Sequence, residues 1–137
     1  MGAHILVPFD GSKHSLKALH IASDLAVKYK CGVRVLVIVP SSRKADRTAR
    51  TKAEGLISTA SEKLSKLGVD GIETEIEFGD IAEGIVFVAS RHKMKIIVMG
   101  CRGVKEGTET ATGGTKQFGS VSQKVFQLAD CTCISVK

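Results

Sequence analysis

Short apolar runs alternate with longer amphipathic stretches along this chain of 137 residues. The runs are rich in β-branched residues and predict five strands, at residues 4–9, 33–39, 71–78, 95–99 and 132–136. The stretches carry apolar residues at helical spacing and predict four helices, at residues 16–29, 47–67, 81–91 and 120–128. Strands that alternate with helices imply right-handed crossovers and a parallel sheet covered on both faces. The sequence therefore predicts one three-layer, doubly wound, five-stranded α/β domain over residues 1–137.

The third predicted strand differs from the others because acidic and apolar residues alternate along it. Its glutamates stand at positions 73, 75 and 77, between isoleucine, threonine and phenylalanine residues. A period of two is typical of a strand with one face toward solvent. We therefore expect this strand to be half-exposed and to lie at an edge of the sheet.

A glycine-rich stretch separates the fourth predicted strand from the last helix. It holds glycines at positions 100, 103, 107, 113, 114 and 119, interleaved with threonines. Such a loop gathers unpaired N–H groups and the positive end of a helix dipole, which suits a phosphate. Doubly wound sheets bind ligands outside the carboxyl ends of the strands, where the strand order reverses. If strands one and four are neighbours there, residues 8–10 and 100–119 face the same ligand.

Two common glycine motifs for phosphate binding are absent. A P-loop requires a lysine and then a serine or threonine after its second glycine, but residues 113–116 read Gly-Gly-Thr-Lys and follow no strand directly. The dinucleotide fingerprint requires three glycines after the first strand, and residues 10–12 hold one. What remains is Gly-x-x-Gly at 100–103 and Gly-Ser at 119–120.

Three segments carry a family resemblance: residues 100–103 (Gly-Cys-Arg-Gly), residues 119–122 (Gly-Ser-Val-Ser) and residues 8–12 (Pro-Phe-Asp-Gly-Ser). Together with the closing residues 129–136, they resemble the universal stress protein family over nearly the whole chain. The resemblance implies a Rossmann-like fold of the adenine nucleotide alpha hydrolase type, usually in a homodimer. Its nucleotide-binding branch carries Gly-x2-Gly-x9-Gly-Ser/Thr and holds ATP. The resemblance implies no settled catalytic reaction.

The resemblance also implies a set of contacts to ATP or another adenine nucleotide, with or without Mg²⁺. Along the adenosine it implies Pro8 and Asp10, with the backbone of Val39 facing the adenine. Around the ribose and phosphates it implies Gly100, Arg102, Gly103, Gly119, Ser120 and Val121. Glycines allow close approach, an arginine adds positive charge, and a serine at a helix start donates or accepts. The glycines equally fit a tight turn after a strand, and the serine fits a helix cap.

The spacing departs from the family pattern in one place. Fifteen residues separate Gly103 from Gly119, where the pattern has nine. We assign the extra residues to 107–115, a polar stretch that is expected to be mobile without ligand. Two hypotheses follow: the stretch is a lid over the nucleotide, or it has displaced the phosphate site.

Composition narrows the classes of protein. No apolar run approaches the roughly 18 residues of a membrane span. The segment Met1–Pro8 is too short for a signal peptide. We therefore expect a soluble cytoplasmic protein without membrane contact. The net charge is +6, but no aromatic residues are interleaved with the basic ones. We therefore expect no nucleic-acid partner and interpret the basic clusters at 43–52 and 91–95 as solvated helix faces.

The four cysteines match no disulfide framework and predict free thiols. Cys131 and Cys133 would point the same way from a strand, but a metal site would need further ligands. Cys101 is interpreted as a small residue in a serine-like place rather than as a redox centre. We thus expect no metal site.

Three functional hypotheses remain. The first is a small homodimeric stress-response or regulatory module that binds ATP or a related adenine nucleotide. The second is a slow ATP hydrolase or a protein that phosphorylates itself on Ser120 or Ser122. For this hypothesis Asp10 alone is a thin basis for a catalytic base or a Mg²⁺ site. The third is a dimeric scaffold protein without nucleotide, pairing through the last strand, Thr132–Val136.

Overall fold

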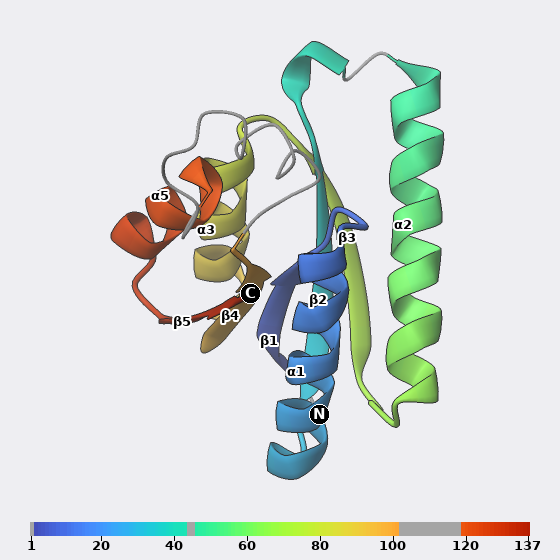
Figure 1. The fold of residues 1–137 in the computed structure, drawn as a ribbon, viewed down its shortest axis with the longest axis vertical. Coiled ribbons are helices and arrows are strands. Elements are labelled where there is room, and N and C mark those ends of the chain that lie inside the picture. Colours follow the sequence, from blue (N-terminus) through green and yellow to red (C-terminus); the bar gives the residue numbers. More distant parts are fainter. Residues whose placement is uncertain (1, 44–45, 102–118) are drawn as a thin grey trace.

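The computed structural model describes residues 2–43, 46–101 and 119–137. Five parallel strands form one sheet in the order β3-β2-β1-β4-β5 (Figure 1). The strands are β1 (Ala3–Pro8), β2 (Gly32–Val39), β3 (Ile72–Phe78), β4 (Ile96–Gly100) and β5 (Thr132–Val136). The helices are α1 (Lys13–Tyr29), α2 (Arg47–Lys66), α3 (Ile81–Arg91) and α5 (Ser120–Leu128), with a short 3-10 turn at Ser41–Arg43.

These elements confirm the predicted order and the doubly wound fold. Helix α1 begins at Lys13 rather than at residue 16, because Ser12 supplies the cap. Strands β1 and β4 are neighbours, which meets the condition under which residues 8–10 and 100–119 would face the same ligand. Strand β3 lies at one edge of the sheet, as its alternating pattern predicted.

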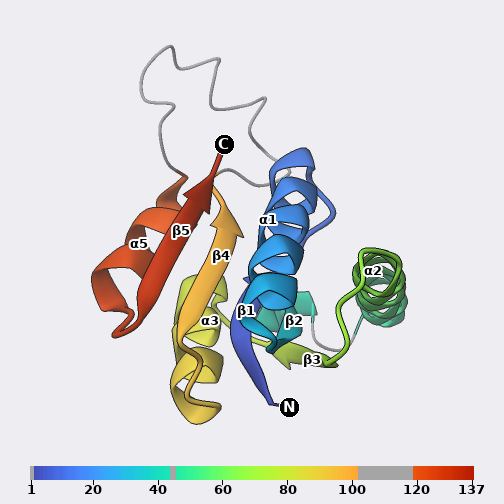
Figure 2. The same cartoon turned by 90° about the horizontal axis from the view of Figure 1, so that it is seen from below.

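The helices form two layers, one on each face of the sheet (Figure 2). Helices α1 and α2 cover one face, and α3 and α5 cover the other. Side chains alternate between the two layers along each strand. In β1, Ile5 and Val7 pack toward α1 and α2, whereas Leu6 packs toward α3.

The central strands are buried on both faces, which explains why their sequences are almost continuously apolar. Val7, Val35 and Val98 are fully buried in the core beneath α1 and α2. Leu6 and Ile97 are fully buried in the core on the opposite face. Among the described residues, no helix is long and apolar enough to cross a membrane.

Candidate functional site

The strand order reverses between β1 and β4, so the connections that leave these two strands turn to opposite faces of the sheet. The two strands pair in register, Ile5 with Ile96 and Leu6 with Ile97. Pro8 ends β1 and Gly100 ends β4, and both lie at the carboxyl end of the sheet. This is the place at which doubly wound proteins bind their ligands.

The turn after β1 is organised by its own side chains. The N–H of Ser12 donates to Asp10 Oδ1 at 2.9 Å, and the Ser12 hydroxyl accepts from the N–H of Ser15 as the cap of α1. Gly11 adopts a φ of +84°, and a Cβ there would lie 2.9 Å from Leu56 of α2. Asp10 is exposed at this turn, just after the carboxyl end of β1.

Gly100 allows β4 to end directly against the first turn of α1. A Cβ at this position would lie 2.6 Å from the Cβ of His14 and 3.1 Å from the N–H nitrogen of Ser15. Side chains do not tolerate a contact of 2.6 Å, and the neighbouring atoms belong to the first turn of α1. The absence of a side chain at Gly100 therefore lets the ends of β4 and α1 come together. The sequence predicted a close approach to a nucleotide at this glycine, and that stays a prediction.

Cys101 connects β4 to the two elements that close the fold. Its N–H donates to the carbonyl oxygen of Val136 at 2.9 Å, and its own carbonyl oxygen accepts from the N–H of Gly119 at 2.7 Å. The Ser122 hydroxyl also donates to the Cys101 carbonyl, at 3.2 Å. The side chain of Cys101 is buried, in keeping with the prediction of a small packing residue.

Helix α5 begins differently from the other described helices. Its N-cap is Gly119, which forms no side-chain cap within the described residues. In contrast, Ser12, Asp46 and Asp80 cap the first turns of α1, α2 and α3. The first N–H groups of α5, those of Ser120 and Val121, therefore stay available to an anion beside the end of β4.

The two serines near the start of α5, Ser120 and Ser122, differ in their exposure to solvent. Ser120 is exposed, whereas Ser122 is buried and its hydroxyl donates to the carbonyl oxygens of Cys101 and Gly119. A hydroxyl in this position is not presented to a phosphoryl donor. Of the two serines in the self-phosphorylation hypothesis, the geometry leaves Ser120.

The remaining predicted contacts lie apart or outside the described residues. Val39 ends β2 and is buried; its carbonyl oxygen accepts from the N–H of Gly79 at 2.9 Å. Arg102, Gly103 and the predicted lid at 107–115 lie outside the described residues. The structure thus brings Pro8, Asp10, Gly100 and the start of α5 to one end of the sheet.

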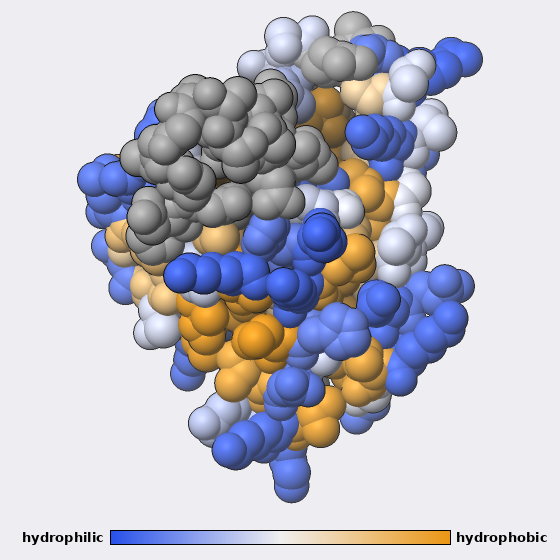
Figure 3. Space-filling model, viewed as in Figure 1, coloured by the Kyte–Doolittle hydropathy of each residue, from blue (hydrophilic) through white to orange (hydrophobic). Residues whose placement is uncertain are grey.

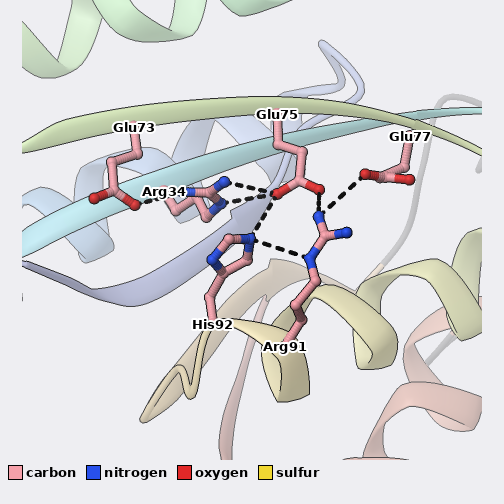
Figure 4. A network of polar contacts seen from close by, with 6 residues as sticks. All are labelled: Arg34, Glu73, Glu75, Glu77, Arg91 and His92. Atoms are coloured by element: carbon pink, nitrogen blue, oxygen red, sulfur yellow. Dashed lines mark hydrogen bonds and ion pairs between the residues drawn. The ribbon is translucent and has the colours of Figure 1, made fainter.

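A charged cluster between β2, β3 and the end of α3 was not predicted (Figure 4). It consists of Arg34 on β2, three glutamates on β3 and the end of α3, namely Glu73, Glu75, Glu77, Arg91 and His92. Arg34 pairs with Glu73 at 2.5 Å and with Glu75 at 2.9 Å. Arg91 pairs with Glu75 and Glu77, and His92 Nε2 lies 3.1 Å from Glu75 Oε1.

The sequence did not predict these contacts. The side chain of Arg91 is 44% exposed, in keeping with a solvated helix face, and its guanidinium also bridges two glutamates of β3. The side chain of Glu75, in contrast, is only 9% exposed. The alternation along β3 signalled one polar face, but the partners of that face became visible only once β2 and α3 were placed beside it.

The electrostatics of this charged cluster centre on Glu75. Burial alone would raise the pKa of Glu75, but its interactions with Glu77, Arg34 and Arg91 outweigh burial and lower the pKa to about 2. The hydrogen bond with Glu75, followed by burial, raises the pKa of Glu77. The cluster holds the edge strand β3 against β2 and α3 through ion pairs. It is not part of the candidate site at the carboxyl ends of β1 and β4.

The strand order, the two helical layers and the uncapped helix beside the switch point define a Rossmann-like α/β protein. The sequence model of the Universal stress protein family matches residues 1–137. A relative, the universal stress protein YxiE of Bacillus subtilis, is 31% identical and aligns with 97% of each chain. The chain belongs to the universal stress protein family.

Solved structures show the same fold. The universal stress protein of Archaeoglobus fulgidus in complex with dAMP is 22% identical, covers 98% of each chain and superposes with a TM-score of 0.81. A universal stress protein in complex with cAMP is 20% identical, covers 98% of this chain and 97% of its own, and has a TM-score of 0.77. At these identities the likeness establishes the fold of this chain.

Proposed function

We propose that this protein binds an adenine nucleotide at the carboxyl end of the sheet, between β1 and β4, as a small cytoplasmic regulatory module of the stress response. The observation that carries the proposal is the start of α5, where N–H groups without a side-chain cap lie beside the end of β4. That is a suitable setting for a phosphate. Fold relatives in complex with dAMP and cAMP support an adenine nucleotide as the ligand class.

We propose the contacts that the family resemblance implies, at the carboxyl end of the sheet. Pro8 and Asp10 line the adenosine side, after β1, and the free oxygen of Asp10 accepts from a ribose hydroxyl. The Val39 carbonyl, already bonded to one N–H, keeps a second lone pair for the adenine amino group. Gly100 lies under the ribose, and the N–H groups of Ser120 and Val121 donate to phosphate.

A triphosphate would need more hydrogen-bond donors and positive charge than the start of α5 supplies. We propose that Arg102 and Gly103, together with Gly119, extend the phosphate contacts to ATP, with or without Mg²⁺. An arginine supplies charge and paired donors for phosphate oxygens. A preference for ATP over AMP would therefore depend on Arg102, whereas AMP binding would depend on the start of α5.

The experiment measures thermal unfolding with millimolar AMP, dAMP, ADP and ATP, each with and without Mg²⁺. A ligand at one hundred times its dissociation constant adds about 2.7 kcal/mol to the free energy of unfolding. The variant Ser120→Asp places a carboxylate at the proposed phosphate position, so nucleotide affinity should fall about tenfold or more. The unliganded helix should gain about 0.3–1 kcal/mol from the same charge.

A matched control is Thr48→Asp, which puts the same charge in the first turn of α2. It should leave nucleotide affinity unchanged. If no nucleotide shifts the unfolding temperature, the nucleotide proposal fails and the scaffold hypothesis is left. If Ser120→Asp binds as tightly as the wild type, the phosphate is held elsewhere.

We further propose a homodimer formed through β5. Within the described chain, β5 pairs with β4 on one side and with no strand on the other. An unpaired edge strand is a template for a second strand. The surface over β4 and β5, beside α1, is also largely apolar (Figure 3), which is typical of a protein interface.

A further inference from the structure

Cys131 and Cys133 lie one residue apart where the chain enters β5. Both side chains pack against the apolar core beneath α3 and α5. Thr132 between them is exposed, and Ile134 packs against the core on the other face. The alternation along the strand thus places two thiols on one face of the sheet, as the sequence predicted.

The two thiols are close to each other and reachable from solvent. Both are free and only partly buried, because β5 is the last strand of the sheet. Cys133 Sγ lies 3.6 Å from the carbonyl oxygen of Cys131, and both side chains pack against the same apolar core. Burial raises the pKa of both thiols, so at neutral pH they are protonated and slow to react singly.

A disulfide fits this spacing poorly. Two residues along an extended strand are about 6.6 Å apart at Cα, close to the upper limit for a disulfide, and their Cβ atoms would have to approach to about 3.8 Å. A bridging atom relaxes that demand. Two bonds to sulfur of about 2.3 Å each, which meet at about 100° at a pyramidal trivalent centre, hold the sulfur atoms roughly 3.5 Å apart, compared with about 2.05 Å in a disulfide.

The residues around Cys131 and Cys133 limit which kind of atom could join the two sulfurs. In residues 2–43, 46–101 and 119–137, no group of three or more His, Cys, Asp or Glu side chains is placed to hold a metal ion. A structural zinc ion requires four ligands. Two sulfurs within an apolar shell instead suit a soft centre of low coordination number.

We propose that Cys131 and Cys133 form a chelating dithiol site for a soft, thiophilic centre that needs two sulfur ligands, represented by a monosubstituted trivalent arsenical. Two arsenic–sulfur bonds form and two arsenic–oxygen bonds of the hydrated arsenical break. The two thiol protons leave with the hydroxide groups as two waters. Arsenic stays trivalent throughout, so no oxidant or reductant takes part. The site lies on β5 and does not depend on the proposed nucleotide.

The experiment treats the fully reduced protein with one equivalent of phenylarsine oxide. Intact-mass spectrometry should show one phenylarsenic group per chain, and thiol titration should show the loss of two of the four free thiols. The adduct should survive a large excess of a monothiol and should be removed by a dithiol, because a chelate loses both bonds only to another chelator. An adduct that a monothiol removes would overturn the proposal.

Three variants assign the site. Cys131→Ser and Cys133→Ser should each weaken binding in excess monothiol by at least about a hundredfold, while Cys31→Ser should bind like the wild type. Circular dichroism checks that each variant is folded. If Cys133→Ser does not fold, Cys133→Ala takes its place. Equal binding by wild type and Cys131→Ser, or loss of binding in Cys31→Ser, would contradict the assignment.

Discussion

The two edge strands of the sheet are built in opposite ways. Strand β3 carries three glutamates on one face, and these are held by Arg34, Arg91 and His92. Strand β5 reads Thr-Cys-Ile-Ser-Val and carries no charged residue. Both strands have a single neighbour within the described chain.

Charged side chains on an edge strand discourage a second strand from pairing, because pairing would bury or crowd the charges. We therefore expect the charged cluster to oppose association at β3, whereas the described strand β5 carries no charged side chain that would oppose it. The comparison teaches that side chains alone can distinguish the two edges of one sheet, in the direction that the proposed dimer through β5 requires. That role would account for a set of near-buried charges that is energetically costly.

The largest effect should come from removing the centre of the charged cluster. Glu75→Ala removes the near-buried carboxylate that Arg34, Arg91 and His92 share, and leaves Arg34, whose side chain is 14% exposed, with Glu73 alone. Breaking a near-buried pair from one side is costly because the remaining charge stays desolvated. We expect a loss of about 3 kcal/mol in the free energy of unfolding, measured by urea denaturation.

The control for this prediction is Glu73→Ala, which removes a carboxylate that is 44% exposed. An exposed pair contributes about 0–1 kcal/mol, so this variant should lose no more than that. Equal losses for the two variants would show that the charged cluster contributes little beyond surface ion pairs.

The next effect concerns pairing at the two edges. Val136 accepts from Cys101, so its peptide faces β4, and by alternation the N–H of Ser135 faces outward. Ser135→Pro removes that outward donor and leaves the β4 ladder intact. We expect the dimer dissociation constant to rise about 10- to 100-fold, measured by analytical ultracentrifugation.

Thr74→Pro is the matched variant on β3. Gly71 and Gly79 bond to β2 through their backbone, so alternation turns the N–H of Thr74 outward as well. This variant should leave the dissociation constant unchanged. A dimer weakened by Thr74→Pro and not by Ser135→Pro would reverse the roles of the two edges.

The smallest effect is a pH dependence confined to the β3 edge. The interactions of Glu75 lower its pKa from 4.5 to about 2, so its stabilising contribution is complete above pH 4.5 and is lost as pH falls toward 2. The raised pKa of Glu77 opposes this change. We expect a net loss on the order of 1–2 kcal/mol between pH 5 and pH 2 after solvent screening.

Urea denaturation across that pH range, with wild type and Glu75→Gln side by side, measures this contribution. The Gln variant cannot titrate at position 75, so its stability should vary less with pH. Identical pH profiles would show that other carboxylates dominate acid unfolding.

Much of the fold was predictable because it depends on local patterns. The β-branched runs and the helical stripes are each visible within a few residues of sequence. These patterns need no knowledge of which distant residues meet. The neighbouring placement of β1 and β4 stood only as a condition for the ligand site until the structure showed the strand order.

The charged cluster was not predictable by the same means. The contact between Arg34 and Glu75 joins residues 41 positions apart, and it exists because β2 and β3 pair in one particular register. The contact of Gly100 with α1 was not predicted either, since the sequence analysis assigned this glycine to a nucleotide contact and gave no neighbour within the fold. The proposed roles of Arg102 and Gly103 stay predictions.

Cys101 would couple the proposed nucleotide binding to the proposed dimerisation. Its amide nitrogen holds the end of β5 and its carbonyl oxygen holds the start of α5, so a single residue joins the proposed dimer edge to the proposed phosphate helix. A shift in either partner would change the hydrogen bond to the other. Such coupling is reciprocal: if nucleotide tightened self-association tenfold, self-association would tighten nucleotide binding tenfold.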